Sequence, residues 1–500
     1  MNIPMSIPLP GYGWIRSLMK WRNILAASSV ALPMSTLAQE TKSTFTVEDI
    51  RAWSGQPIVR QSERVPGYRG IWFTLGFKFK YGDKYSGGLG TYTSNHEPMA
   101  VYSPSANKTF FTYGGTSGPE KRELAIMVSY FDHATGKVPK PVLLYFDPSV
   151  DDPHDNASIQ LDKEGYVWVF KSGRGTKRPG IIFRSTKPGS IDAFECVSVQ
   201  EFTYPQVWYD DAKGFFLLFT KYKFAKGRGP ARELYWKSSV DGRVWTEDKM
   251  LAGFEGHYQT SGHRGDKIVT FFNWHPGSDV DKRTNLYFAQ TTDRGKTWTT
   301  ADGKPLKLPL DAPKNEALVV DYKARGMNMY TCDVNFDKSG NPILLFVTSH
   351  AGEPGPAGDP REWTVMHWTQ GKWETHIVTQ SGHNYDMGSI YVKGDEWRIV
   401  GPTGAPPQKY GTGGEMVLWV SPDEGKSWNM KRQLTGKSPY NHSYARRPAS
   451  ATDPFFAFWA DGDPTRLTKS HLFFTDSTGD HVRRLPYDMK EDFEAPEPLQ

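Results

Sequence analysis

The sequence predicts an all-β protein built as a multi-bladed β-propeller. Three observations support this fold class: a turn motif that recurs at long intervals, strand-like runs before each copy, and a composition rich in aromatic residues and turn formers. Aromatic residues make up 14% of the 500 residues, beside 48 Gly and 36 Pro. Aromatic side chains favour pleated sheets, whereas Gly and Pro mark turns. The composition therefore argues against a mainly helical protein.

The recurring motif is the Asp-box, S-x-D-x-G-x-x-W. Residues 421–428 (SPDEGKSW) match every position, and residues 291–298 (TTDRGKTW) match with Thr in place of Ser. Residues 238–245 (SSVDGRVW) are a degenerate copy, with Val240 at the Asp position. The Asp accepts hydrogen bonds from backbone amides of a tight hairpin turn, the Gly takes a positive φ, and the Trp packs beneath. Hairpins that recur in this way indicate propeller blades, although chance turns in an unrelated β-sandwich are the alternative.

Strand-like runs accompany these and other turns. Residues 234–236, 286–289 and 416–419 precede the three motifs, and runs at 166–170 and 342–347 follow two further turns. Helical periodicity is nearly absent after the N-terminal segment. We therefore expect residues 39–500 to form a single propeller with no appended domain.

The N-terminal segment, residues 1–38, has the features of a signal peptide. A basic region precedes a short apolar stretch at 24–34 and a small-residue cleavage site at 36–38. The alternative is an uncleaved membrane anchor, but the apolar stretch is short for a membrane span. We expect a secreted or periplasmic protein whose mature chain begins near Gln39.

The net charge limits the classes of binding partner, and the cysteine content limits the kinds of structural site. The formal net charge is +5, and the leader carries three cations and no acids, so 5 − 3 leaves +2 for the mature chain. This value is too small to indicate a polyanion partner on its own, and we expect no nucleic acid, no membrane partner and a monomer. Cys196 and Cys332 are the only cysteines, which excludes a disulfide scaffold and a Cys-rich zinc site. Buried free thiols are favoured over a disulfide between them.

The densest group of chemically active residues lies near predicted blade starts, where propeller loops converge. It contains His133, His154, Tyr204 and Lys221. Two imidazoles, a phenol and an ammonium group can supply acid–base chemistry together with a cation for an anionic substrate. The alternatives are ordinary surface-loop residues, or a metal site at His154 with its Asp neighbours.

Other polar positions are candidates for substrate binding. They are His96, His275, Tyr385 and Arg446. His, Tyr and Arg suit the recognition of sugar hydroxyls and carboxylates. For each lone His, a structural role that ties neighbouring blades together is the alternative.

Several stretches give the sequence a wider resemblance. They are residues 67–72, 95–96, 132–133, 154–156, 204–206, 384–388 and 444–448. With these stretches the chain resembles the BNR-repeat propellers, a group that includes ulvan lyases, rhamnose–glucuronate lyases and related α-L-rhamnosidases. The resemblance covers nearly all of the chain after the leader. It implies a seven-bladed β-propeller with Asp-box (BNR) repeats.

The resemblance also implies an activity, a polysaccharide lyase. His133 and His154 match the histidine pair of the lyases, Tyr204 matches their tyrosine, and Lys221 stands where they usually have Arg. Lys keeps the charge but cannot clamp a carboxylate with two parallel hydrogen bonds. The implied reaction is β-elimination in an acidic, ulvan-like polysaccharide of uronate and rhamnose, with either histidine as base, Tyr204 as acid and Lys221 as the neutralising cation. No cofactor is required, although such propellers often hold a structural Ca²⁺.

Three other functions remain open at this stage. His96 matches the catalytic histidine of the rhamnosidase branch, which lies on the opposite face and hydrolyses rhamnose linked to glucuronate. A sialidase would carry an Arg-Ile-Pro or Arg-Leu-Pro motif near its N-terminus, whereas here the tripeptide occurs only at residues 484–486. A non-catalytic lectin would bind oligosaccharide through its aromatic rings alone.

Overall fold

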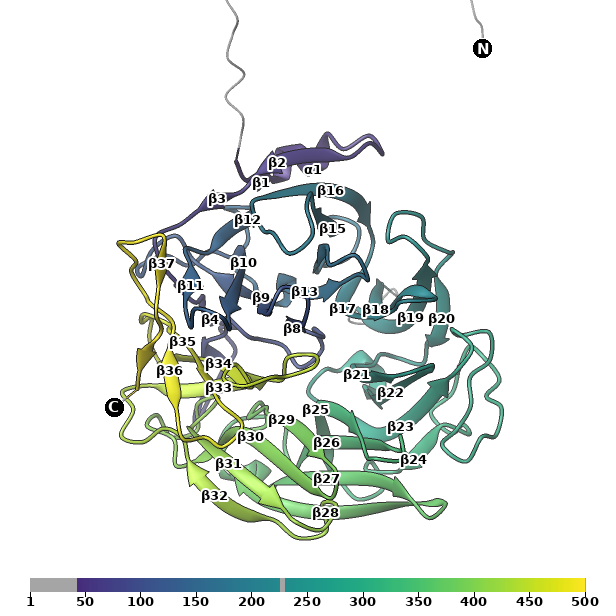
Figure 1. Ribbon diagram of the computed structural model, residues 1–500. Helices are drawn as coiled ribbons and strands as arrows, with labels where there is room; N and C mark the ends of the chain where they lie inside the picture. The colour runs from purple at the N-terminus through teal and green to yellow at the C-terminus, as the bar shows by residue number, and fades with distance from the viewer. Residues whose placement is uncertain (1–42, 225–229, 500) are drawn as a thin grey trace, which may run out of the picture. The chain divides into compact units, whose positions relative to one another are not determined.

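The described part of the chain is a seven-bladed β-propeller. The computed structural model describes residues 43–224 and 230–499, which form almost only β-strands. Seven sheets of four to six strands radiate from a central axis (Figure 1). This confirms the predicted fold class. The described residues form one compact unit, and the predicted signal peptide lies outside them.

Each blade begins with its innermost strand and proceeds outward along the chain. Blade 1 contains β8 (Ala100–Ser103), β9 (Lys108–Gly115), β10 (Ala125–Asp132) and β12 (Val142–Phe146). Blade 2 contains β13 (Ala157–Leu161), β14 (Val167–Lys171), β15 (Gly180–Ser185) and β16 (Ala193–Gln200). Blade 3 contains β17 (Thr203–Asp210), β18 (Gly214–Lys223), β19 (Ala231–Ser239) and β20 (Lys249–Ala252). Blade 4 contains β21 (Gln259–Arg264), β22 (Lys267–Trp274), β23 (Thr284–Thr291) and β24 (Leu318–Val320).

The last three blades repeat this pattern. Blade 5 contains β25 (Asn328–Phe336), β26 (Pro342–Ser349), β27 (Arg361–Thr369) and β28 (Lys372–Ser381). Blade 6 contains β29 (Ser389–Lys393), β30 (Glu396–Gly404), β31 (Glu415–Ser421) and β32 (Asn429–Gln433). Blade 7 contains β33 (Asn441–Arg446), β34 (Ala457–Gly462), β35 (Leu472–Thr475), β36 (Val482–Arg484) and β38 (Glu497–Pro498).

The N-terminal segment covers the outer edges of the first two blades. Strands β1 (Phe45–Thr46) and β3 (Glu63–Arg64) pair with β12, and β2 (Ile58–Gln61) pairs with β16. The short helix α1 (Val47–Arg51) joins β1 to β2. Covering an edge strand satisfies its free backbone groups and blocks pairing with other chains.

A second early segment closes the ring between blades 1 and 7. Strand β4 (Trp72–Thr74) pairs with β7 (Ser86–Gly88). The Ile71 amide donates to the Gly114 carbonyl of blade 1 at 2.9 Å, and Trp72 Nε1 donates to the Asp463 carbonyl beside blade 7 at 2.7 Å. Strand β11 (Val138–Pro139) pairs with β37 (Phe493–Glu494), which adds a second link between the two ends of the described chain.

The remaining elements are short. They are the hairpin of β5 (Lys78–Phe79) and β6 (Gly82–Asp83), and the 3₁₀ turns η1 (Pro153–Asp155), η2 (Pro276–Ser278) and η3 (Pro356–Gly358). The apolar core lies between neighbouring blades; Trp236 and Trp298, for example, join blades 3 and 4 with ring centroids 5.3 Å apart. Cys196 and Cys332 are buried free thiols.

The Asp-boxes form the predicted turns, and the degenerate copy has a different register. Asp423 accepts a hydrogen bond from the Ser427 amide at 2.9 Å, and Gly425 has a φ of +83°. In the degenerate copy Asp241, and not Val240, accepts from the Arg243 and Val244 amides at 2.9 and 3.0 Å. The turn is therefore S-x-D-G-x-x-W starting at Ser239, one residue shorter than the full motif.

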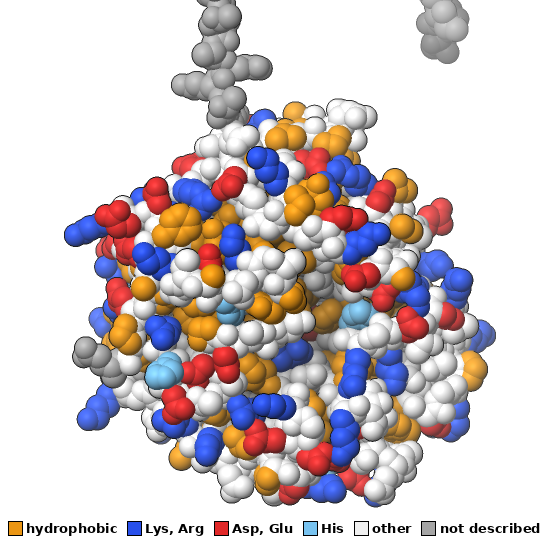
Figure 2. All heavy atoms as spheres, viewed as in Figure 1, with side chains coloured by type: hydrophobic (Ala, Val, Ile, Leu, Met, Phe, Trp, Pro, Cys, Tyr) orange, Lys and Arg blue, Asp and Glu red, His pale blue; other side chains and the backbone are white. Residues whose placement is uncertain are grey.

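The visible face of the molecule carries no dominant charge. In Figure 2, Lys and Arg side chains alternate with Asp and Glu over the visible face, so that neither sign dominates it. Within residues 43–224 and 230–499, no helix is long and apolar enough to cross a bilayer. The same residues contain no group of three or more His, Cys, Asp and Glu side chains that could hold a metal ion, and the expected Ca²⁺ therefore has no recognisable carboxylate cluster there.

Candidate active site

Polar residues converge on the axis at the end of the propeller where the innermost strands begin. His154 lies in η1 just before β13, Tyr204 lies at the start of β17, and Tyr258 directly precedes β21. Arg283 precedes β23, and Tyr385 lies shortly before β29. Because the blades are arranged around one axis, side chains at the starts of their inner strands meet there although they are far apart in sequence.

His154 is held as a neutral imidazole. Its Nδ1 donates to the Asp152 carboxylate, while its Nε2 lies 2.8 Å from the Tyr85 hydroxyl and 2.7 Å from the Tyr92 hydroxyl. Since Nδ1 carries the proton, Nε2 accepts from the phenols. Burial lowers the pKa of His154 to about 4, although Asp152 opposes this shift.

Tyr204 and Tyr258 form a pair with opposite ionisation behaviour, and their ring centroids are 5.5 Å apart. Burial raises the pKa of Tyr204 well above its usual value, so this phenol keeps its proton. Burial also opposes ionisation of Tyr258, but Arg232, Arg283 and Arg174 outweigh it and lower its pKa to about 8. A tyrosine pair with separated pKa values is a typical arrangement for an acid and a base.

Three guanidinium groups surround this pair. Arg174 donates to the Tyr204 hydroxyl at 3.0 Å and lies 3.6 Å from Asp152. Arg283 lies 4.5 Å and Arg232 5.5 Å from the ring centroid of Tyr258. In the described part of the chain, no carboxylate lies within ion-pair distance of Arg232 or Arg283. Two cations without a counter-ion make the site suitable for an anionic ligand.

Unpartnered buried atoms around the pair also point to a ligand site. His275 packs against Tyr258 with ring centroids 4.8 Å apart, and neither of its ring nitrogens has a hydrogen-bond partner. The hydroxyl of Tyr444 and Nε2 of His96 are likewise buried without partners. Native proteins leave few such groups, and each can bond a ligand or an ordered water. A small cavity of about 10 Å³, room for about one water molecule, lies among Tyr92, Asn95, Tyr204, Tyr258, Arg283, Tyr385 and Tyr444.

Most of the residues predicted from the sequence meet at this place. His154 and Tyr204 approach with ring centroids 6.0 Å apart. The Tyr385 hydroxyl accepts from Arg283 at 2.7 Å, and His275 lies beside Tyr258. The ring of His96 lies 5.6 Å from that of Tyr204, fully buried.

His133 lies elsewhere. It follows β10, its ring packs on Tyr102 and Phe131, and its Nδ1 is 3.1 Å from the Asp453 carbonyl. The beginning of β10 pairs with the end of β9, where Gly114 lies against the Asn156 side chain. His133 is therefore one strand length, about 24 Å, from the His154 end of the blade. The expectation that the two histidines act together is not met.

Lys221 also points away from the site. It forms ion pairs with Asp248 at 2.5 Å and Glu201 at 3.7 Å. Its neighbour Tyr222 lies under Arg174 and Arg232, and successive residues of a strand face opposite sides of the sheet. Its charge is already neutralised, so Lys221 is not available to a substrate carboxylate.

Arg446 supports the site from behind. Its Nη1 donates to the Thr93 carbonyl at 2.8 Å, its Nη2 donates to the His96 carbonyl, and Glu97 lies 3.8 Å away. These bonds fix the loop that carries His96 and leave little of the guanidinium for a ligand. The predicted role in substrate binding is thus replaced by a role in positioning the loop.

The cations that do face the site were not singled out from the sequence. Arg174, Arg232 and Arg283 lie in or beside loops between the second and third strands of blades 2, 3 and 4. No motif marks them. Arg232 and Arg283 lie at the start of strands, and this position is the only feature of the local sequence that sets them apart.

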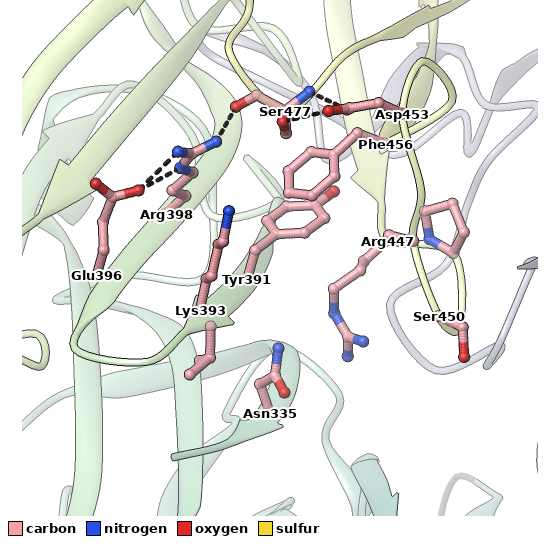
Figure 3. A pocket seen from close by; sticks show the side chains of 13 residues that line it. Asn335, Tyr391, Lys393, Glu396, Arg398, Arg447, Ser450, Asp453, Phe456 and Ser477 are labelled. Carbon is pink, nitrogen blue, oxygen red and sulfur yellow. Dashed lines mark hydrogen bonds and ion pairs between the residues drawn. The ribbon is translucent and has the colours of Figure 1, made fainter. Parts of the chain in front are cut away.

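A larger hollow lies at the other ends of the inner strands. It measures about 350 Å³ and is lined by Asn335, Tyr391 and Arg398, among others (Figure 3). Its arginines are paired: Arg398 with Glu396 at 2.7 Å, and Arg447 with Asp333 at 2.9 Å. Because these charges are satisfied internally, we place the candidate active site at His154, Tyr204 and Tyr258.

Comparisons with known proteins agree with the fold. Two curated relatives are similar to this chain. The "Ulvan lyase" of Alteromonas sp. (strain LOR) is 22% identical over 316 residues, which cover 56% of this chain and 63% of the relative. The "Ulvan Lyase-PL25" of Pseudoalteromonas sp. (strain PLSV) is 20% identical over 324 residues, which cover 55% of this chain and 64% of the relative. The matches thus span less than two thirds of either relative.

Solved structures show the same architecture. A PL25 ulvan lyase bound to -[GlcA(1-4)Rha3S]- aligns with a TM-score of 0.64 at 15% identity, covering 83% of this chain and 96% of the other. The polysaccharide lyase Uly1 aligns with a TM-score of 0.57 at 11% identity, covering 84% and 99%. Residues 121–381, more than half of the sequence, match the BNR repeat-containing family. The chain therefore belongs to the BNR repeat-containing family, as its Asp-box turns and seven blades indicate.

Proposed function

We propose that this protein is a polysaccharide lyase that cleaves an acidic polysaccharide by β-elimination at a uronate. The observation that carries the proposal is that Arg232 and Arg283, which have no counter-ion among the described residues, lie near two tyrosines with separated pKa values. The names of the two curated relatives and of the aligned structures support the same reaction class.

The reaction needs a cation, a base and an acid. The base removes the proton at C5, the electron pair forms a double bond between C4 and C5, and the C4–O bond breaks while the acid protonates the departing oxygen. A cation at the C6 carboxylate lowers the energy barrier to removal of the C5 proton, because it stabilises the negative charge that develops on the carboxylate.

Arg232 and Arg283 are suited to the first task. Both face Tyr258, and a guanidinium can hold a carboxylate with two parallel hydrogen bonds. The lysine expected in this role, Lys221, is bound to Asp248 and Glu201. Arg232 and Arg283 therefore supply the guanidinium group that is absent at position 221.

The tyrosine pair is suited to the proton transfers. Tyr204 is protonated, accepts from Arg174 and hydrogen-bonds to Tyr258, so it can pass its proton to the leaving oxygen when that oxygen replaces Tyr258 as the acceptor. Tyr258, with a pKa of about 8, supplies a phenolate base at mildly alkaline pH. His154 is neutral, but its Nε2 is occupied by Tyr85 and Tyr92, so we assign it to positioning these two rings.

The proposed substrate is an ulvan-like polysaccharide of uronate and rhamnose. The aligned PL25 ulvan lyase is bound to -[GlcA(1-4)Rha3S]-, an oligosaccharide with a carboxylate and a sulfate in each repeat. We also propose that residues 1–38 direct export and that the enzyme acts as a secreted or periplasmic monomer, since polymers of this size are met outside the cytoplasm.

The deciding experiment follows product formation. Incubation with ulvan should give the ultraviolet absorbance of an unsaturated uronate, and Tyr204→Phe should abolish it. If the wild-type protein produces no such absorbance from ulvan, β-elimination on this polymer is excluded.

Hydrolysis of terminal rhamnose remains the second candidate, because His96 Nε2 is buried without a partner beside Tyr204. A hydrolase would release rhamnose from rhamnose-capped glucuronate glycans without ultraviolet absorbance, and His96→Ala would then be the damaging change. Measuring both signals in one reaction separates the two activities.

A further inference from the structure

The hairpin of β5 and β6 presents aromatic and basic side chains to solvent next to the candidate site. Residues 77–81 alternate aromatic and basic, Phe-Lys-Phe-Lys-Tyr. Phe77 is 63% exposed and Phe79 36% exposed. Large apolar side chains at such exposure cost free energy in water and often mark a binding surface when they occur together.

The basic side chains of this surface have no internal counter-ions. Within the described residues, no carboxylate lies within ion-pair distance of Lys78, Lys80 or Lys409. Asp83, the register partner of Lys78, instead accepts from Thr74 Oγ1 at 2.9 Å and from the Gly76 amide at 2.8 Å. The lysines therefore add a local positive charge to an exposed aromatic surface.

An aromatic contact anchors the hairpin to blade 6. Tyr81 meets Tyr410 with ring centroids 4.9 Å apart, and Lys80 and Lys409 each lie over one of these rings, at 5.3 and 4.8 Å. Tyr410 lies in the loop between β30 and β31. The two loops thus form one continuous strip, which we call the rim strip: Phe77, Lys78, Phe79, Lys80, Tyr81, Lys409 and Tyr410.

The rim strip is connected directly to the site. Lys84, which follows the hairpin, forms an ion pair with Asp281, and the next residue, Tyr85, reaches His154 Nε2 at 2.8 Å. Phe79 precedes Tyr85 by six residues, so at about 3.3 Å per residue the strip begins within about 20 Å of the site. The strip and the candidate site therefore lie at the same end of the propeller.

A hollow lies between the rim strip and the outer strands β27 and β28 of blade 5. It measures about 510 Å³ and is lined by Lys409, Tyr410, Gln380, Ser381 and Arg361, among others. Arg361 donates to Asn384 Oδ1 at 2.7 Å, and Asn384 is the neighbour of the site residue Tyr385. Amide and hydroxyl groups of this kind can bond sugar hydroxyls.

We propose that the rim strip and this hollow form an outer subsite that holds an anionic sugar unit of the polysaccharide, several units away from the bond that is cut. The proposal rests on the proposed function and specifies where the substrate chain runs. Aromatic rings offer faces for the apolar sides of sugar rings, and the lysines offer point charges for a sulfate ester or a carboxylate.

The test uses paired charge reversals in the full chain. Lys78→Glu with Lys80→Glu is compared with a control, Lys296→Glu with Lys426→Glu, which alters two exposed lysines in Asp-box turns at the other ends of the strands. The rim variant should raise KM on polymeric ulvan about tenfold, leave kcat unchanged, and leave KM unchanged on the shortest oligosaccharide that the enzyme cleaves. Phe77→Ala with Phe79→Ala should act in the same direction.

A binding measurement tests the outer subsite independently of the lyase activity. In affinity electrophoresis, ulvan should retard the wild type more than the rim variant, while desulfated and carboxyl-reduced ulvan show which anion is held. Retardation that depends on the rim lysines in a protein without lyase activity would support the subsite and contradict the proposed function. Cleavage with the same KM in rim and control variants, or a change in oligomeric state on reversal, would overturn the subsite.

Discussion

Arg174 Nη1 donates to the Tyr204 hydroxyl oxygen at 3.0 Å. The phenol oxygen is thus an acceptor in this contact, and its own hydrogen is directed to Tyr258, whose pKa this bond helps to lower. A guanidinium at this distance also stabilises the phenolate that remains after the proton has left. The contact therefore supports the proposed role of Tyr204 as a general acid.

Removing the Tyr204 hydroxyl should abolish most of the activity without unfolding the protein. Tyr204→Phe is expected to lower kcat by about two to four orders of magnitude, the usual contribution of a general acid. Tyr209→Phe, at the other end of β17, is the matched control. Equal rates for both variants in the ultraviolet assay, with unchanged melting temperatures, would remove Tyr204 from the mechanism.

The site arginines should matter far more than Lys221. Arg232→Ala and Arg283→Ala are expected to lower kcat/KM by about two to three orders of magnitude, because each removes a cation from a desolvated anion site. Lys221→Ala and His133→Ala should stay close to wild type in steady-state kinetics. A large loss in Lys221→Ala would instead restore the role that the sequence assigned to it.

The rate should rise with pH through the range around 8. The proposed base, Tyr258, has a pKa of about 8 and is active when deprotonated, so below this value the rate should fall about tenfold per pH unit. Arg232→Lys keeps the charge and should keep the profile, whereas Arg232→Ala should move the profile to higher pH. A rate that is flat between pH 6 and 9 would exclude this base.

Mild acid should destabilise the fold. Burial lowers the pKa of His154 to about 4 and the pKa values of His257 and His383 to about 3. The folded values lie below the unfolded value near 6.5, so the unfolded chain binds more protons below pH 6.5 and stability falls as the pH drops toward 4. Each histidine can contribute up to about 3 kcal/mol across this window. Denaturant midpoints at pH 7, 6, 5 and 4 measure the fall, and His383→Asn should make it shallower; a constant midpoint would contradict it.

The shifted Asp-box should be as important to stability as the full one. Asp241→Ala and Asp423→Ala should each lower the free energy of unfolding by about 1–3 kcal/mol, because backbone amides lose their acceptor. Val240→Asp should give no gain, since position 240 does not face these amides. Thermal unfolding checks all three variants, and a stabilising Val240→Asp would show that the turn can change register.

The fold could be predicted because its signals are local. Each Asp-box joins two strands within a few residues, and residues 421–428 alone specify a turn, a positive-φ glycine and a hydrogen bond from the partly buried Trp428 ring to the Gly425 carbonyl. The register of the copy at Asp241 was missed because the motif tolerates a deletion that keeps the hydrogen bonds.

The site could be predicted only in part. His154 and Tyr204 stand at the starts of inner strands, and their position along the chain fixes their place near the axis. His133 stands at the opposite end of a strand, and Lys221 on the opposite face of one, and sequence spacing does not distinguish these placements. Arg174, Arg232 and Arg283 come from three blades and meet only after the ring has formed.

The hydrogen bond between Trp72 and Asp463 can form only late in the synthesis of the chain. Trp72 leaves the ribosome almost four hundred residues before its acceptor, so the ring cannot close until nearly the whole chain has been made. Until then the first blade exposes the surface that the last blade will cover. Since Tyr85 belongs to the same segment and contacts His154, the segment that helps to close the ring also contributes to the candidate site.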